Sequence, residues 1–250
     1  MLHDVVRVAF APWFEACVFA CPPDRLPLVA EWACLVAQLI GEPSHPAMHA
    51  FRVEHVDLSE ASGALCIAWE GAPSGPRWEE GLSRYRTDRR LVIEAATRAL
   101  AVRSARWNSV AGALDPPPPA WTRALRSTQA PWFARGLDVP AGRADLVLAM
   151  ALWVGELTGG PGGDRADVGD GADILGIEEE FGALRVAHGW PRGHAAAFAV
   201  TAISIVSHAL CPACGTPARV PGAFVSLAVH GGEQDCQGCR GGGRRRRALA

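Results

Sequence analysis

One tetrapeptide, APWF, occurs twice in the 250-residue chain, at Ala11–Phe14 and again 119 residues later at Ala130–Phe133. Further matches follow both copies in the same order: PPDR and PAGR, then a long apolar stretch in each copy, then GALCIAW and GALRVAH. A repeated sequence predicts a repeated structural unit, because each copy must form the same local elements. The matches therefore predict a tandem duplication, which limits the fold to two similar units.

Each copy reads as helix, hairpin, helix. The first apolar stretch of each copy ends at a glycine, Gly41 or Gly159, where a helix C-cap fits. Short alternating segments around turn residues predict the hairpins. The expected helices span 26–41, 87–105, 144–159 and 193–210, and the expected strands span 51–58, 64–69, 174–179 and 183–188. The predicted fold class is α+β, with the two units packed sheet to sheet or helix to helix.

Near the end of the chain, Cys211 and Cys214 form one CxxC pair, and Cys236 and Cys239 form another, with 21 residues between them. Two such pairs at this separation suit a tetrahedral four-cysteine zinc site, because each pair sits on a tight knuckle that directs both sulfurs at one ion. Gly215 follows the first pair, where such a knuckle turns. The alternatives are a pair of disulfides or four thiols without a metal.

Residues 209–240 resemble a zinc ribbon, and the resemblance covers this segment only. It implies one structural Zn²⁺, since four thiolates leave no open coordination position for catalysis. The segment departs from the commonest ribbon pattern in that Arg240, not glycine, follows the last cysteine. His208 and His230 lie close in sequence and are alternative ligands or neighbours of the ligands. We expect His208 to end the preceding helix and His230 to end a strand.

These observations give the expected organisation of the chain. It comprises a first α+β unit over 1–114, a stiff proline linker over 115–119, a second α+β unit over 120–208, a zinc ribbon over 209–240 and a basic disordered tail over 241–250.

The charged residues exclude several classes of protein and suggest one type of partner. All 24 basic residues are arginine, so a P-loop lysine, a kinase strand lysine and Schiff-base chemistry are absent. No HExxH, GxSxG or GxGxxG motif occurs. The end of the chain is basic on an acidic body of about −7, which predicts an interaction tail that could contact DNA or RNA. The candidate nucleic-acid residues are Arg240, Arg244, Arg245, Arg246 and Arg247.

Three histidines, His45, His49 and His55, are close together in HPAMHAFRVEH and could supply an open three-ligand metal site. The alternative is surface or partly buried histidines, and the second copy has no equivalents. An aspartate-rich stretch over 164–173 suggests calcium, but its spacing does not match an EF-hand and a solvated loop fits better. We interpret Glu178–Glu180 in the same way, as a solvated hairpin tip.

The four remaining cysteines lie on apolar stretches of the first copy. Cys17 and Cys21 would be neighbours on a helix and could form half of a metal site. We expect all four, Cys17, Cys21, Cys34 and Cys66, to be buried small hydrophobic residues instead.

The sequence is compatible with three functions, which we rank in order of preference. The first is a non-enzymatic interaction or adaptor protein with a structural zinc ribbon and a protein partner, for which the acidic body suits a basic protein. The second is a nucleic-acid-associated protein that uses the ribbon and the arginine tail. The third is a metal-dependent enzyme that uses the region of His45, His49 and His55. Charges and prolines interrupt every apolar run and the N-terminal segment, so we expect no membrane span, no signal peptide and a cytoplasmic location.

Overall fold

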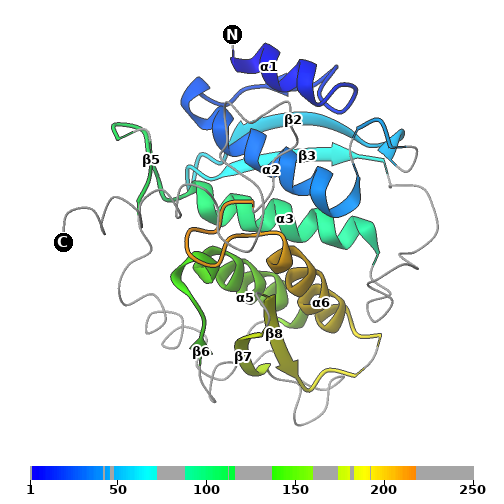
Figure 1. Ribbon diagram of the computed structural model, residues 1–250, viewed down its shortest axis with the longest axis vertical. Coiled ribbons are helices and arrows are strands. Elements are labelled where there is room, and N and C mark those ends of the chain that lie inside the picture. The colour runs from blue at the N-terminus through cyan, green and yellow to red at the C-terminus, as the bar shows by residue number, and fades with distance from the viewer. Residues whose placement is uncertain are drawn as a thin grey trace, which may run out of the picture.

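The computed structural model describes residues 2–41, 43–45, 48–71, 88–111, 113–115, 137–159, 174–180, 183–191 and 193–217. These residues form both helices and strands, so the predicted α+β class is correct. Two three-stranded sheets lie at opposite ends of the molecule, and helices α3, α5 and α6 lie between them (Figure 1). Within the described part of the chain, every helix is too short or too polar to cross a bilayer.

The first unit comprises the described residues up to 115. Its strand order is β1-β2-β3, with β1 parallel to β2 and β2 antiparallel to β3. In chain order its elements are α1 (Leu2–Ala9), β1 (Val18–Phe19), the 3-10 helix η1 (Pro23–Arg25), α2 (Leu26–Ile40), β2 (Arg52–Leu58), β3 (Leu65–Glu70), α3 (Arg89–Ser104), β4 (Trp107–Asn108) and β5 (Ala113–Leu114).

The second unit comprises the described residues from 137 to 208. Its strand order is β6-β7-β8, with the same parallel and antiparallel pairing as in the first unit. Each sheet also has one register shift in its antiparallel pair, at Val53/His55 and at Ile174/Gly176. In chain order its elements are β6 (Leu137–Asp138), the 3-10 helix η4 (Ala141–Arg143), α5 (Ala144–Thr158), β7 (Ile174–Glu180), β8 (Ala183–His188) and α6 (Ala195–His208).

The predicted helices and hairpins are all present, with ends within two residues of the expected positions. The helix stops have the expected cause. Gly159 adopts a left-handed conformation with φ of 74° immediately after α5, and Gly41 caps α2 with φ of 135°. Both values lie in the region that favours glycine, because a Cβ atom there meets the backbone.

The same buried hydrogen bonds recur at the end of the last helix of each unit. The hydroxyl of Ser104 accepts from the Leu65 amide at 2.6 Å, and the hydroxyl of Ser207 accepts from the Leu184 amide at 2.8 Å. Each bond ties a helix end to the first residues of the neighbouring strand. The duplication itself stays a prediction about how the sequence arose.

In each unit, an arginine from the 3-10 helix donates to a carbonyl at the C-terminus of the last helix of that unit. Arg25 donates to the carbonyl of Ser104 at 2.7 Å, and Arg143 donates to the carbonyl of Ser207 at 2.6 Å. The carbonyls at a helix C-terminus have no partner within the helix, so these guanidinium groups satisfy acceptors that would otherwise need water. The repeated PPDR and PAGR motifs thus supply one residue each for the same contact.

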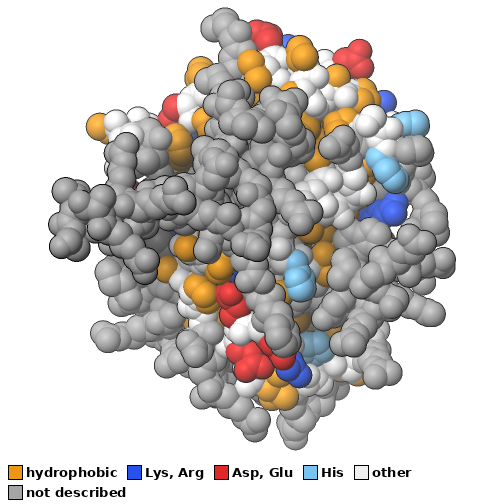
Figure 2. All heavy atoms as spheres, viewed as in Figure 1, with side chains coloured by type: hydrophobic (Ala, Val, Ile, Leu, Met, Phe, Trp, Pro, Cys, Tyr) orange, Lys and Arg blue, Asp and Glu red, His pale blue; other side chains and the backbone are white. Residues whose placement is uncertain are grey.

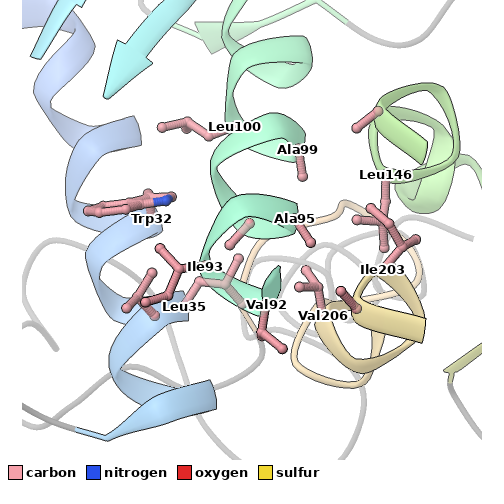
Figure 3. Packing of buried hydrophobic residues seen from close by; sticks show 14 of the residues in the cluster. Trp32, Leu35, Val92, Ile93, Ala95, Ala99, Leu100, Leu146, Ile203 and Val206 are labelled. Carbon is pink, nitrogen blue, oxygen red and sulfur yellow. The ribbon is translucent and has the colours of Figure 1, made fainter. Parts of the chain in front are cut away.

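The two units pack helix against helix, which decides between the two arrangements that the sequence left open. Helix α3 lies centrally, with α2 on one side and α5 and α6 on the other (Figure 3). Ala95 and Ala99 face the second unit near Leu146 and Ile203, whereas Leu100 points toward α2 (Figure 3). Small side chains on this face of α3 allow the helix backbones to approach closely, and the buried apolar surface stabilises the pair.

The first copy of APWF belongs to the core. Trp13 and Phe14 are fully buried, and Trp13 stacks on Phe10 with ring centroids 5.9 Å apart. Trp32 of α2 completes this aromatic cluster and donates its indole N–H to Thr97 of α3. Buried aromatic rings of this size fix α1 and α2 against the sheet. The second copy, 130–133, lies outside the described residues.

Candidate metal centre

Cys211 and Cys214 lie on a tight turn that follows α6, and residues 211–215 are called the knuckle below. α6 ends at His208, as expected, and the chain then makes a single bridge between Leu210 and Pro217. Inside this bridge the Cys211 amide donates to the Thr216 carbonyl at 2.7 Å, and the Gly215 amide donates to the Cys211 carbonyl at 2.8 Å. The turn predicted around the first CxxC pair is therefore formed.

The knuckle contacts the second unit through two glycines. The Gly142 amide in η4 donates to the Pro212 carbonyl at 3.1 Å. A Cβ atom on Gly142 would lie 2.3 Å from that carbonyl oxygen, and one on Gly215 would lie 2.5 Å from the Gly142 oxygen. Gly215 also has φ of 72°. Two stretches of backbone thus lie in direct contact, at a distance that only glycine permits.

Two buried arginines, one from each unit, bind backbone carbonyls of the knuckle and of Leu210, the residue just before it. Arg103, on α3 of the first unit, donates Nη1 to the Cys214 carbonyl at 2.9 Å. Arg143, fully buried in the second unit, donates Nη1 to the Leu210 carbonyl at 2.9 Å. Arginine suits this role because its fixed fork of donors can satisfy several carbonyls at once. The knuckle therefore lies where the two units meet.

Acidic side chains accompany both arginines. Glu31 lies 3.4 Å from Nη2 of Arg103, and Glu179 lies 3.6 Å from Nε of Arg143. Burial raises the pKa of the Glu31 carboxyl above its usual range, and the charge of Arg103 opposes this effect. The interpretation of Glu179 as part of a solvated hairpin tip was wrong, because its carboxylate faces a buried guanidinium.

The arrangement of the first two predicted ligands fits a metal knuckle. Cys211 is fully buried and Cys214 is partly buried, with its Sγ 3.0 Å from Oγ1 of Thr216. Two cysteines three residues apart on a tight turn that ends in a left-handed glycine are the form in which half of a four-cysteine zinc site is built. The other two predicted ligands, Cys236 and Cys239, lie outside the described residues, as do His230 and the tail arginines 240 and 244–247.

The three-histidine hypothesis fails in the structure. Among the described residues, which include His45, His49 and His55, no group of three or more His, Cys, Asp or Glu side chains is placed to hold a metal. His55 lies on β2 and its Nε2 is 3.7 Å from Asp57, while the His45 ring packs against Gly41. His55 lies within β2, whereas His45 and His49 precede that strand, so closeness in sequence does not assemble a three-ligand site. The aspartate-rich stretch 164–173 lies outside the described residues.

The remaining cysteines are structural in three cases out of four. Cys17, Cys21 and Cys34 are buried free thiols, as expected, whereas Cys66 is exposed on β3 and the prediction for it was wrong. Burial raises the pKa of the Cys17 thiol to about 11 and that of Cys34 to about 12. A thiol with so high a pKa stays protonated near neutral pH, so it is a poor nucleophile.

A turn of the same span closes the first unit. Trp107 pairs with Leu114 across β4 and β5, as Leu210 pairs with Pro217. Inside this turn the carboxamide oxygen of Asn108 accepts the amides of Val110 and Ala111, at 3.1 and 3.0 Å. Asn108 is equivalent in position to Cys211, because each is the first residue inside its bridge. Sequence reasoning missed this match, although WNSVAG and LCPACG both follow the last helix of a unit.

The counterpart of Gly142 also differs in the first unit. In PPDR and PAGR the third residue is Asp24 or Gly142. Asp24 accepts the indole N–H of Trp107 at 2.9 Å, and this hydrogen bond lowers the pKa of its carboxyl. The first unit thus holds its turn with a carboxylate and an indole, where the second uses direct backbone contact.

A small pocket lies beside the knuckle, between the two units. Trp32, Leu100 and Leu146 form its apolar wall, and Glu31 and Arg103 are among its polar residues. Its cavity volume is about 30 Å³. The pocket opens to solvent, and its walls come from both units.

Comparison with known proteins gives no assignment: no family model, no curated protein and no solved structure matches the chain. The residues that hold the knuckle are therefore identified from geometry alone. Gly142 and Arg143 had a sequence signal in the PAGR repeat, whereas Arg103 had none, because nothing in the amphipathic pattern of α3 separates it from the other arginines of that helix.

Proposed function

We propose that the protein is a non-enzymatic interaction protein, in which one structural Zn²⁺ fastens a C-terminal ribbon to a two-unit body. The observation that carries the proposal is the position of the knuckle. Its backbone accepts hydrogen bonds from Arg103 of one unit and from Gly142 of the other, at 2.9 and 3.1 Å. A metal held there would cross-link the C-terminal segment to the junction of the units.

The residues Cys211, Cys214, Cys236 and Cys239 would hold the ion. Bound by four thiolates, Zn²⁺ supplies a cross-link and a fixed tetrahedral geometry, with no position left for water or substrate. The protein's own contribution is to hold the first two thiols in place: Gly215 turns the chain, and the hydrogen bond between the Cys211 amide and Thr216 closes the turn. This chemistry supports a structural role for the metal.

The charges near the knuckle and on the body of the chain favour a protein partner. Glu31, which lines the pocket beside the knuckle, is paired with Arg103, whose Nη2 atom lies 3.4 Å from its carboxylate. The body of the chain is acidic at about −7 without the arginine tail, so the partner we propose is a basic protein surface.

Nucleic-acid association remains the second candidate, and it depends on the arginines from 240 to 247. On the face shown in Figure 2, acidic, basic and histidine side chains are scattered over the described residues, with no continuous basic band among them. A protein that wraps nucleic acid over its body would present such a band. For this candidate we propose contact with phosphate through the arginines from 240 to 247, a stretch without acidic residues.

The experiment compares binding of generic DNA and RNA by the full chain and by a variant in which Arg244–Arg247 are replaced by glutamine. The matched control replaces an exposed body arginine, Arg185→Gln. We expect no binding at moderate salt by any of the three proteins. Binding that falls steeply with salt and is lost only in the tail variant would replace the interaction proposal with nucleic-acid association.

A further inference from the structure

We infer that Gly142 and Arg103, neither of which is a metal ligand, are positioning residues of the zinc site, and that they couple zinc binding to the docking of the two units. The inference rests on the proposed zinc site and adds a linkage to it. It starts from the fact that the knuckle contacts residues of both units, through Arg103 on α3 and Gly142 in η4.

The backbone contact at Gly142 leaves no room for a side chain. A single added Cβ would meet the Pro212 oxygen at 2.3 Å and the Cys214 nitrogen at 2.7 Å. Atoms do not approach so closely without displacement, so any side chain at 142 must move the backbone that carries both thiols. The position of η4 and the conformation of the knuckle therefore determine each other.

The displacement would be passed on to the first unit. η4 leads directly into α5, and Asp145 in the first turn of α5 forms an ion pair with Arg106, which follows α3. The Nε atom of Arg106 donates to Asp145 at 2.9 Å, with both side chains mostly buried. A second route is direct, since Arg103 is 8% exposed and donates to the Cys214 carbonyl. Both routes connect the knuckle to the end of α3.

The first unit shows what the metal supplies to the second. At the place of Cys211 it has Asn108, whose carboxamide accepts two turn amides and so holds the turn without an ion. In the turn that follows the second unit, Cys211 stands at this place, and a zinc ion bound to its thiolate would fix the turn through tetrahedral geometry instead. Metal binding would then order the knuckle, and the ordered knuckle would favour the docked arrangement. Because such a coupling is reciprocal, docking contacts must also raise zinc affinity.

The test measures Zn²⁺ affinity of the full chain by competition with a chromophoric chelator. The variants are Gly142→Ala and Arg103→Gln, and the matched control is Arg98→Gln. Arg98 also lies on α3 and reaches the second unit, but its guanidinium is paired with Glu94 at 2.6 Å and Glu156 at 2.8 Å, away from the two contacts tested. We expect Gly142→Ala to weaken zinc binding by about tenfold or more and Arg103→Gln by about fivefold, with Arg98→Gln within about twofold of wild type.

Hydrogen exchange on the same proteins gives a second readout. Removal of zinc from wild type should increase exchange at the end of α3 and the start of α5, and leave the β2–β3 pair unchanged. If Gly142→Ala does not fold, Arg103→Gln decides the affinity test alone. Zinc bound by wild type, with both knuckle variants binding it equally well, would overturn the coupling and leave the proposed zinc site intact. A wild-type chain that takes up no zinc would overturn both.

Discussion

In the first unit the turn that follows the last helix is held by side chains, whereas in the second it is held by backbone contact, glycines and a buried arginine. The turn of the first unit is stabilised by the side chain of Asn108 and by the hydrogen bond from Trp107 to Asp24. The turn that follows the second unit is stabilised by backbone contact at Gly142 and Gly215 and by a hydrogen bond from Arg143. Both solutions close a turn of the same span. The second leaves two cysteines in the turn and therefore makes it a place where a metal can add rigidity.

The largest difference between the units is expected at their equivalent arginines. Arg143→Met removes donors to the Ser207 and Leu210 carbonyls from a site that is 0% exposed and leaves Glu179 beside it without its partner. We expect a loss of about 3 kcal/mol or more in the free energy of unfolding, because a broken buried pair leaves polar groups unsatisfied. Chemical denaturation measures this loss.

Arg25→Met is the matched variant in the first unit. Arg25 donates one hydrogen bond, to the Ser104 carbonyl, where Arg143 donates two, and its guanidinium lies over the partly exposed Trp107 ring. We therefore expect a loss of about 1 kcal/mol in the free energy of unfolding. Equal losses for the two variants would show that the second turn is no more dependent on its arginine than the first.

The two serines should behave alike. Ser104→Ala and Ser207→Ala each remove a buried hydroxyl that accepts a strand amide and leave the Leu65 or Leu184 amide without that acceptor. We expect each variant to lose about 1–3 kcal/mol of unfolding free energy in denaturant titrations. A loss confined to one of them would contradict the structural equivalence of the two helix ends.

The smallest effect is expected at Asp24 and depends on pH. The hydrogen bond from Trp107 lowers the pKa of Asp24, so its contribution to stability is present above the ordinary aspartate pKa and is lost as pH falls through the lowered value. Trp107→Phe should therefore reduce stability by less than about 1 kcal/mol at neutral pH, with a smaller deficit in acid.

A double-mutant cycle with Asp24→Asn isolates that pair. We expect the coupling energy between Asp24 and Trp107 to be present at neutral pH and to fall in acid. In the Asp24→Asn background, the stability lost on Trp107→Phe should be the same at both pH values. A Trp107→Phe deficit that is the same at acid and neutral pH would assign the effect to lost packing, and the two turns would then differ less than the structure indicates.

The sequence was sufficient for the elements that local pattern controls. Alternation and capping glycines placed the helices and hairpins, and the duplicate copy supported each assignment. The short strands β1 and β6 were missed because two-residue parallel strands have no periodicity of their own. The burial of Glu179 against Arg143 was missed for a different reason: the contact joins a strand to a 3-10 helix, and three consecutive glutamates read as a solvated surface.

The candidate site was only partly accessible from sequence. Spacing identified Cys211 and Cys214 and the turn at Gly215, because a knuckle is local. The roles of Arg103 and Gly142 arise only when α3 and η4 are brought against the knuckle by the packing of the units. The histidine hypothesis was wrong because residues close in sequence need not meet in space. His49 precedes β2 and His55 lies within it, and no three-ligand group forms among the described residues.

We propose that the cysteine turn after the second unit holds a structural metal. The direct measurement is the zinc content of the full chain together with X-ray absorption at the zinc edge, for wild type, for Cys211→Ser and for the exposed-cysteine control Cys66→Ser. We expect one zinc per chain with four sulfur neighbours at about 2.3 Å, retained in Cys66→Ser and lost or altered in Cys211→Ser. A wild-type chain without zinc, or one whose zinc has the same ligands in Cys211→Ser, would contradict it.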